Sequence, residues 1–173
     1  MFGPKRIALL GIVSAVAAAC FQQAGAAPLP APAGKPILQI SGDITEKNSA
    51  NAAVFDRAML EALGMATIQT NTPWYTGSVK FEGVPLDKLM SDVGAKGDRI
   101  VAYALNDYMT EIPIEDLVKH HAILALKRDG QYMPVSDKGP LFIVYPYDSD
   151  PDLQTQVYYG RSAWQVAKIT VKP

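Results

Sequence analysis

The chain has few residues whose types could support catalysis or metal binding. His120 and His121 are its only two histidines. Adjacent side chains of a strand point to opposite faces, so these two rings would be poorly placed to bind one metal ion. With Glu115 and Asp116 nearby in the sequence, we expect the end of a solvent-exposed strand here rather than a metal site.

Two further motifs match known functional patterns only in part. The acidic run 148–152 begins like a calcium-binding loop, but Tyr159 stands where such a loop needs its final glutamate. Ser162 occupies a G-x-S frame, but Trp164 stands where a nucleophile elbow has its second glycine. We therefore expect a polar turn at the first motif and no serine hydrolase at the second. The sequence contains neither a P-loop nor a G-x-G-x-x-G motif.

Aromatic and hydrogen-bonding residues outside the periodic apolar pattern are better suited to binding a ligand. They form three groups: residues 70–77 around Trp74, Asn106 with Tyr108, and residues 158–164, which combine three aromatic rings with Arg161. Binding residues concentrate in loops that a scaffold positions. Aromatic faces, a guanidinium and amides suit a flat heterocycle with several hydrogen-bonding edges. The alternative is that Trp74 and Trp164 fill the core.

Apolar periodicity predicts the elements that would hold these groups. One helical face is indicated by Phe55, Ala58, Met59, Ala62 and Leu63, with candidate N-caps over 48–51 and a C-cap at Gly64. A second helix is predicted over 86–93, with Pro85 at its first turn and Gly94 at its end.

The remaining periodic segments predict strands. They cover residues 37–42, 99–105, 122–127, 131–135, 141–145 and 165–171, with a hairpin turn at Asp129-Gly130. We find no internal repeat and no extended βαβ alternation. The expected fold class is α+β, with a mixed β-sheet and two or three short helices.

The N-terminal segment indicates a signal peptide. Two basic residues precede an apolar run over 7–19, which is too short to span a bilayer, and an A-x-A cleavage site ends at Ala26. We therefore expect residues 1–26 to be removed on export. The alternative is a lipoprotein anchored through Cys20. No later apolar stretch approaches the length of a membrane span.

Beyond that segment, residues 27–36 contain four prolines and predict an extended tether, and residues 37–173 predict a single domain. Removal of residues 1–26 leaves 14 basic against 17 acidic residues, a formal net charge of −3, which provides no basic surface for nucleic acid. The same removal takes away Cys20, the only cysteine, so the mature domain has neither a disulfide nor a thiolate ligand.

Several short motifs occur in a characteristic order from about residue 37 to residue 172. The two most specific are Gly83-Val84-Pro85-Leu86 with Leu89, and Gly139-Pro140-Leu141 with Tyr145-Pro146. The others are Ile40-Ser41-Gly42, Trp74, Asn106-Asp107-Tyr108, Asp129-Gly130 with Met133-Pro134, and Trp164 with Ile169 and Val171. In this order they resemble the molybdopterin-binding domain of the sulfite oxidase superfamily, in its small stand-alone bacterial form. The resemblance implies the sulfite-oxidase-like molybdopterin-binding fold.

Enzymes of that family hold molybdenum through one cysteine thiolate, shortly before the tryptophan and the Gly-Val-Pro-Leu segment. Counting back from Trp74 or Gly83 places this position at Thr70 or Asn71, and neither residue offers a thiolate. We therefore expect no bound molybdenum and no catalytic residue. If the protein is an enzyme, the resemblance implies a molybdopterin oxidoreductase.

Small family members without the cysteine resemble periplasmic pterin-binding proteins. These pass ligand status to the periplasmic domain of an inner-membrane sensor, such as an enzyme that makes or degrades cyclic di-GMP. The resemblance implies a pterin held non-covalently between Trp74 and Trp164. The expected ligand-binding residues are Thr70, Asn71, Trp74, Asn106, Tyr108, Arg161, Ser162 and Trp164. The alternatives are a molybdopterin-dependent oxidoreductase or its accessory subunit, and a scaffold subunit with a vestigial pocket.

Overall fold

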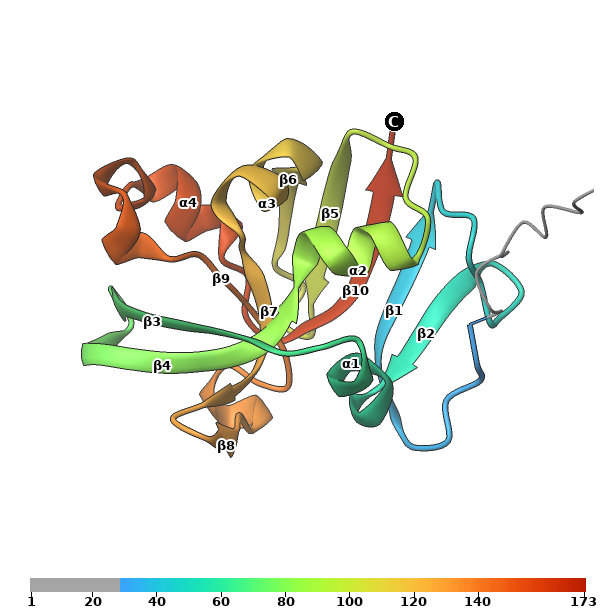
Figure 1. Ribbon diagram of the computed structural model, residues 1–173, viewed down its shortest axis with the longest axis horizontal. Helices are drawn as coiled ribbons and strands as arrows, with labels where there is room; N and C mark the ends of the chain where they lie inside the picture. The colour runs from blue at the N-terminus through green and yellow to red at the C-terminus, as the bar shows by residue number, and fades with distance from the viewer. Residues whose placement is uncertain (1–28) are drawn as a thin grey trace, which may run out of the picture.

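The computed structural model describes residues 29–173, and over these residues it contains two β-sheets and four short α-helices (Figure 1). The expected α+β class is confirmed, although the strands form two sheets rather than one. The predicted signal peptide with Cys20, and the first two residues of the predicted tether, lie outside the described residues.

The first sheet is mixed and has the strand order β2-β1-β10-β5-β6. Its strands are β1 (Pro36–Gly42), β2 (Ala52–Asp56), β5 (Arg99–Ala104), β6 (Met109–Pro113) and β10 (Val166–Lys172). β1 and β10 run parallel, and the other neighbours are antiparallel. Alternate residues such as Leu38, Ile40 and Ile169 are fully buried, because successive side chains of a strand face opposite sides of the sheet.

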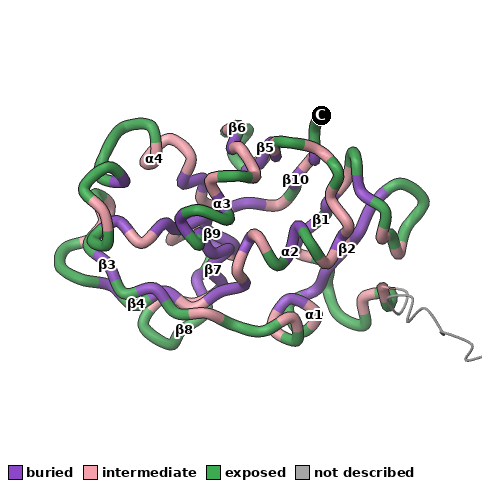
Figure 2. Tube along the Cα trace, turned by 45° about the horizontal axis from the view of Figure 1, so that its top comes forward, coloured by how far each residue is buried: buried purple, intermediate pink, exposed green. Residues whose placement is uncertain are grey.

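The second sheet is antiparallel and carries the central part of the core. It comprises β3 (Ala66–Thr72), β4 (Tyr75–Pro85), β7 (Ile123–Arg128) and β8 (Gln131–Tyr132), with β9 (Phe142–Val144) paired to β7. Figure 2 shows an almost continuous buried stretch along β7 and β9. Residues 123–126 of β7 and all of β9 are buried on both faces, so they lack the polar alternation of a surface strand.

Short helices cover the sheets, and the first three α-helices are followed by a glycine or a histidine in the left-handed conformation. They are α1 (Arg57–Ala62), α2 (Leu86–Asp92), α3 (Ile114–His120) and α4 (Gln156–Arg161), with 3₁₀ turns η1 (Val135–Asp137), η2 (Tyr147–Ser149) and η3 (Pro151–Leu153). The predicted helix over 86–93 is confirmed as α2, which follows Pro85 and buries Leu86, Leu89 and Met90. In Figure 1 this helix crosses in front of the first sheet.

The first predicted helix is wrong at its beginning. Residues 52–56 form β2, and Asp56 rather than a residue of 48–51 is the N-cap of α1. Phe55 fits the helical spacing, but its side chain is fully buried from a strand that pairs with β1. Tertiary pairing here outweighs the local helical pattern. The predicted end is confirmed, because Gly64 adopts a positive φ of 101° directly after the helix.

Three regions that were expected to be loops or a strand end instead form helices or a β-hairpin. Residues 70–77 belong to the β3–β4 hairpin, and residues 156–161 form α4. His120 and His121 end helix α3 instead of an exposed strand, with His120 buried and His121 in the left-handed conformation at φ 52°. These helices are only six or seven residues long, so they leave little periodicity in the sequence.

Residues 29–36 of the predicted tether contact the domain. Leu29 packs against the core, and the backbone N–H of Gly34 donates to the Asp56 carboxylate at 2.7 Å. The same carboxylate accepts from the Met59 N–H at 2.9 Å as the cap of α1. These hydrogen bonds lower the pKa of Asp56, and the one from Met59 has the larger effect on that pKa. One side chain therefore joins the N-terminal segment to the first helix.

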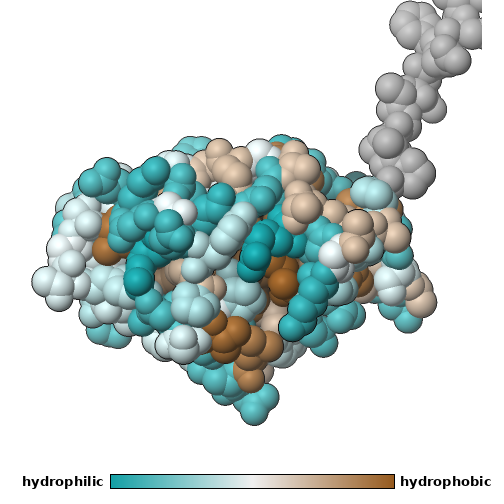
Figure 3. Space-filling model, turned by 90° about the horizontal axis from the view of Figure 1, so that it is seen from below, coloured by the Kyte–Doolittle hydropathy of each residue, from teal (hydrophilic) through white to brown (hydrophobic). Residues whose placement is uncertain are grey.

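The surface seen from below is largely hydrophilic, with apolar side chains in small separate patches (Figure 3). Among residues 29–173, no helix is long and apolar enough to cross a membrane.

The close approach of β4 and β7 at Gly83 can be tested by substitution. A Cβ at this position would lie 2.2 Å from the Leu124 carbonyl oxygen, so the two strands would have to separate. We expect Gly83→Ala to lower the free energy of unfolding by about 1–3 kcal/mol. Urea unfolding followed by tryptophan fluorescence measures this change.

Gly160→Ala is the matched control, because its Cβ would meet only the Tyr108 hydroxyl, at 3.9 Å. We expect no loss of stability there, since alanine is the better helix former. Equal stability of the two variants would contradict the close approach.

Candidate functional site

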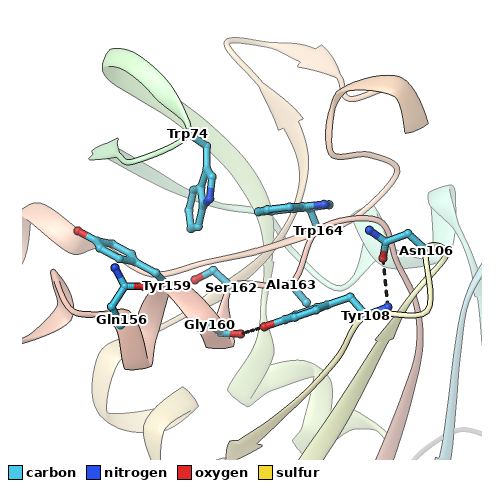
Figure 4. Close-up of a pocket in the computed structure, with 9 residues that line it drawn as sticks. All are labelled: Trp74, Asn106, Tyr108, Gln156, Tyr159, Gly160, Ser162, Ala163 and Trp164. Carbon is cyan, nitrogen blue, oxygen red and sulfur yellow. Dashed lines mark hydrogen bonds between the residues drawn. The ribbon is translucent and has the colours of Figure 1, made fainter.

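A pocket of about 260 Å³ opens where α4, the β3–β4 turn and the β5–β6 turn meet (Figure 4). Every side chain that lines it is uncharged, and four of the nine lining residues are aromatic. They are Trp74, Asn106, Tyr108, Gln156, Tyr159, Gly160, Ser162, Ala163 and Trp164. The structure thus brings together five of the eight residues predicted to bind ligand: Trp74, Asn106, Tyr108, Ser162 and Trp164.

The two tryptophans do not enclose a flat ligand between them as expected. Their ring centroids are 5.7 Å apart and the ring planes are inclined by 79°, so Trp74 meets Trp164 edge to face. Trp164 and Tyr108 instead lie on opposite sides of the pocket with their faces toward each other (Figure 4). A flat ligand on the face of Trp164 would therefore lie opposite Tyr108, and Trp74 forms a side wall.

Trp74 also packs in the core, which was the alternative role predicted for it from the sequence. Besides Trp164, its ring packs edge to face against Phe142 at 5.4 Å, Tyr159 at 5.9 Å and Tyr147 at 6.1 Å. Both tryptophans are partly buried against the hydrophobic core. Each therefore belongs to the core and exposes one part to the pocket.

The β5–β6 turn holds Asn106 and Tyr108 in a defined conformation. Asp107 has a positive φ of 65°, and the backbone N–H of Tyr108 donates to the Asn106 Oδ1 at 3.2 Å. The Tyr108 hydroxyl donates to the carbonyl of Gly160 at 2.7 Å. This bond ties the turn to the last residues of α4 and fixes the Tyr108 ring.

Helix α4 supplies three lining residues that are not among the eight predicted to bind the ligand. Gln156, Tyr159 and Gly160 are spaced i, i+3 and i+4, so they share the helix face that borders the pocket. That spacing is the signal that could have found them. It was missed because residues 158–164 were expected to form a loop.

Ser162 lies at the buried end of the pocket and is only 2% exposed. Its Oγ donates to the backbone carbonyl of Tyr158 at 2.7 Å and is also hydrogen-bonded to the Tyr147 hydroxyl. Burial raises the pKa of Tyr147 well above the ordinary value for tyrosine, so its hydroxyl remains protonated at neutral pH. Ser162 is thus held rigidly rather than free to act as a nucleophile.

Arg161, predicted to contact the ligand, is outside the pocket. Its guanidinium donates to the Asp116 carboxylate of α3, with side chains 23% and 16% exposed. Beside this pair, the Tyr158 hydroxyl and His120 Nε2 are hydrogen-bonded at 3.1 Å. Arg161 therefore anchors α4 to α3, and His120 takes part in the same contact.

A lysine lies near Trp164 without lining the pocket. The Lys138 ammonium is 5.3 Å from the Trp164 ring centroid and 4.7 Å from that of Tyr75. The Tyr75 hydroxyl donates to the Asp137 carboxylate at 2.9 Å. Burial of Tyr75 and, to a smaller extent, this hydrogen bond raise the pKa of Tyr75 to about 12. Lys138 thus links the Tyr75 and Trp164 rings through cation–π contacts.

Thr70 and Asn71, also predicted to contact the ligand, are bound to η2 instead. The Thr70 Oγ1 accepts from the Asp148 N–H at 3.0 Å. The Asp148 carboxylate accepts from both the backbone N–H and the side-chain amide of Asn71, at 2.8 and 2.9 Å. The acidic run 148–152 accordingly forms turns, as expected, with its first carboxylate committed to β3.

These contacts help to decide whether the residues could hold the molybdenum that the family resemblance implies. The two candidate positions for the family's single thiolate carry a hydroxyl and an amide, and both groups are hydrogen-bonded to Asp148. Among the described residues no group of three or more His, Cys, Asp or Glu side chains converges. The residues present therefore do not fit a molybdenum centre held through sulfur.

The fold agrees with a comparison of the sequence with known families. The model of the oxidoreductase molybdopterin binding domain matches residues 48–148, more than half of the 173-residue chain. The protein belongs to this family, as the motifs predicted. No curated protein matches the chain.

The Arg161–Asp116 pair provides a test of how α4 is held. Removing either partner leaves a charge that is largely shielded from water, so we expect Arg161→Ala and Asp116→Ala each to lower the free energy of unfolding by about 1–2 kcal/mol. The double variant should lose clearly less than the sum of the two, with a coupling of at least about 0.5 kcal/mol in urea unfolding. Strictly additive losses would show that the two side chains do not interact.

Proposed function

We propose that this protein is a non-catalytic pterin-binding protein that reports ligand status to a membrane-anchored partner. The observation that carries the proposal is the uncharged pocket in which Trp164 and Tyr108 face each other. Two opposed aromatic faces suit a flat heterocycle, and the surrounding amide and hydroxyl groups can meet its polar edges. Membership of a molybdopterin-binding family supports a pterin as that heterocycle.

The size and charge of the pocket define the ligand further. A volume of about 260 Å³ is below the range of drug-sized sites, so it suits a single bicyclic ring system with a short substituent. Burying a phosphate against this lining would lack a compensating cation. The favoured ligand is a small uncharged pterin without a nucleotide or phosphate extension.

The lack of a sulfur ligand supports a binding role over catalysis. Either Thr70 or Asn71 stands at the position of the family's thiolate, and the polar atoms of both residues are hydrogen-bonded to Asp148. No residue lining the pocket is a histidine, a carboxylate or a lysine that could exchange protons near neutral pH.

The export signal and the pocket rim support the proposed location and partner. The sequence of residues 1–26 predicts a signal peptide, which would deliver the domain to the periplasm. Leu105, Met109 and Val157 are each more than half exposed and are neighbours in sequence of pocket-lining residues. Exposed apolar side chains beside a ligand pocket suit contact with the periplasmic domain of an inner-membrane sensor.

Calorimetric titration with several oxidised and reduced pterins tests the proposed ligand. We expect the wild-type protein to bind at least one pterin, and Trp164→Ala to weaken binding about 5- to 150-fold, which corresponds to the ~1–3 kcal/mol of one stacking face. Tyr132→Ala is the matched control, since Tyr132 is an exposed aromatic residue of β8 outside the pocket. Failure of every pterin to bind, or equal binding by wild type and Trp164→Ala, would refute the proposal.

The family membership also makes a molybdopterin-dependent oxidoreductase, or its accessory subunit, a second candidate. Metal analysis of the protein purified from its native host separates the two. We expect far less than one molybdenum per chain, because no thiolate is available to retain the metal. A preparation from molybdenum-free medium sets the background, and stoichiometric molybdenum would overturn the non-catalytic assignment.

A further inference from the structure

Strand β3 is an edge of the second sheet, because among the described residues it pairs only with β4. Residues of an antiparallel edge strand alternately direct their main-chain N–H and C=O groups toward the neighbouring strand and away from it. Two contacts fix which residues face away. The Asn71 N–H donates to the Asp148 carboxylate of η2, outside the sheet. On β4, the Lys80 carbonyl accepts from the N–H of Asp129, which follows β7, so the main chain of Lys80 turns away from its partner Gln69.

Both contacts place the outward groups of β3 on the same alternate residues. Gln69 lies two positions before Asn71 and Thr67 two positions before Gln69, with no irregularity in their pairing to β4. Their N–H and C=O groups therefore point away from the sheet, and within the described part of the chain they have no hydrogen-bonding partner. β3 also contains no charged residue and no proline, which are the usual means of keeping a free edge from pairing.

A groove of about 470 Å³ lies beside this open edge. One wall is β3 itself over residues 66–68, and the other is formed by the end of α3 and by Pro146 and Asp150 on either side of η2. Ile123, the first residue of β7, adds apolar surface. A groove with two walls fits one extended chain, whereas the edge of a second folded sheet would meet the opposite wall.

The charge of the groove defines the chain that it fits. Lys119 and His121 line the groove at the end of α3, and both are exposed. Lys119 forms no ion pair with another described residue. Asp150, a carboxylate in the same lining, is already committed, because it accepts from the Asp152 N–H at 2.9 Å as the cap of η3. The groove therefore offers a positive charge that an acidic side chain would complement.

We propose that the β3 edge is a docking site for an extended segment of a protein partner, which adds a strand to the second sheet and carries an acidic residue for Lys119. In this mode of recognition, main-chain hydrogen bonds to Thr67 and Gln69 provide affinity, and alternate side chains provide specificity. Apolar side chains at every second position of the segment contact Ile68 and Ile123 in the groove. The site shares no residue with the aromatic pocket, so it does not depend on the proposed function.

Amide hydrogen exchange of the free protein, measured by NMR, tests the assigned edge. We expect the Thr67 and Gln69 amides to exchange at least tenfold faster than those of Ile68 and Thr70, whose main-chain groups face β4. Equal or slower exchange at Thr67 and Gln69 would show that these amides are not free, and would overturn the proposal.

Two acetylated and amidated heptapeptides probe docking to this edge. Both have valine at every second position, and they differ only in carrying two glutamates or two lysines at the same intervening positions. The wild-type protein should bind the glutamate peptide at least threefold more tightly than the lysine peptide, because the two peptides differ in their charge opposite Lys119. At saturation, the glutamate peptide should slow exchange of the Thr67 and Gln69 amides at least tenfold.

Three variants separate main-chain pairing from charge. Thr67→Pro removes one outward N–H but leaves the ladder to β4 intact, because proline is tolerated on the free side of an edge strand. It should weaken the glutamate peptide at least fivefold. Thr67→Val is the matched control, which keeps the N–H and should bind within twofold of wild type. Lys119→Glu should reverse the preference between the two peptides.

Failure of both peptides to bind wild type, or equal binding by folded Thr67→Pro and Thr67→Val, would overturn the proposal. An unchanged preference in Lys119→Glu would overturn it even if Thr67→Pro does not fold. Sedimentation of wild type that shows a dimer, lost in Thr67→Pro, would assign the edge to a second copy instead. None of these experiments contains a pterin, so their failure leaves the proposed function untouched.

Discussion

The edge-to-face packing of Trp74 is the contact on which the site depends. This ring, in the β3–β4 turn, touches Phe142, Tyr147, Tyr159 and Trp164. Such pairs contribute about 0.5–1.5 kcal/mol each beyond burial of their area. Because the partners come from β9, η2, α4 and the segment before β10, one side chain fixes the relative positions of four parts of the chain. The pocket is the space left beside this cluster.

Polar contacts then orient what the aromatic cluster brings together. Arg161 and Asp116 hold α4 on α3, and Tyr158 adds a hydrogen bond to His120. The Ser162 hydroxyl is fixed between Tyr158 and Tyr147 at the buried end of the pocket. These groups are largely buried, so leaving any one unpaired would cost more than the bond contributes when formed. The pocket is consequently rigid at its inner end.

The family's fold is present here without the cysteine that the resemblance implies for its metal chemistry. At the corresponding positions, Thr70 and Asn71 are held by Asp148, which joins β3 to η2. The groups that remain around the pocket are aromatic faces, amides and hydroxyls, with no charged side chain. This set can distinguish flat ligands by shape and by hydrogen bonding. It is suited to recognition, and it lends no support to a redox centre.

The sequence alone determined the fold class, helix α2, the family, the lack of a cysteine at Thr70 and Asn71, and the strands β1, β5, β7, β9 and β10. These depend on local periodicity, on turn residues such as Gly64 and Pro85, or on residue identity at a counted position. Only the tertiary structure decided that Trp164 faces Tyr108 rather than Trp74, that Arg161 turns away to Asp116, and that Ser162 is held between Tyr158 and Tyr147. Each of these outcomes depends on competition between partners far apart in the chain. Short elements such as α3 and α4 are stabilised by those same contacts, and therefore leave almost no trace in the local pattern.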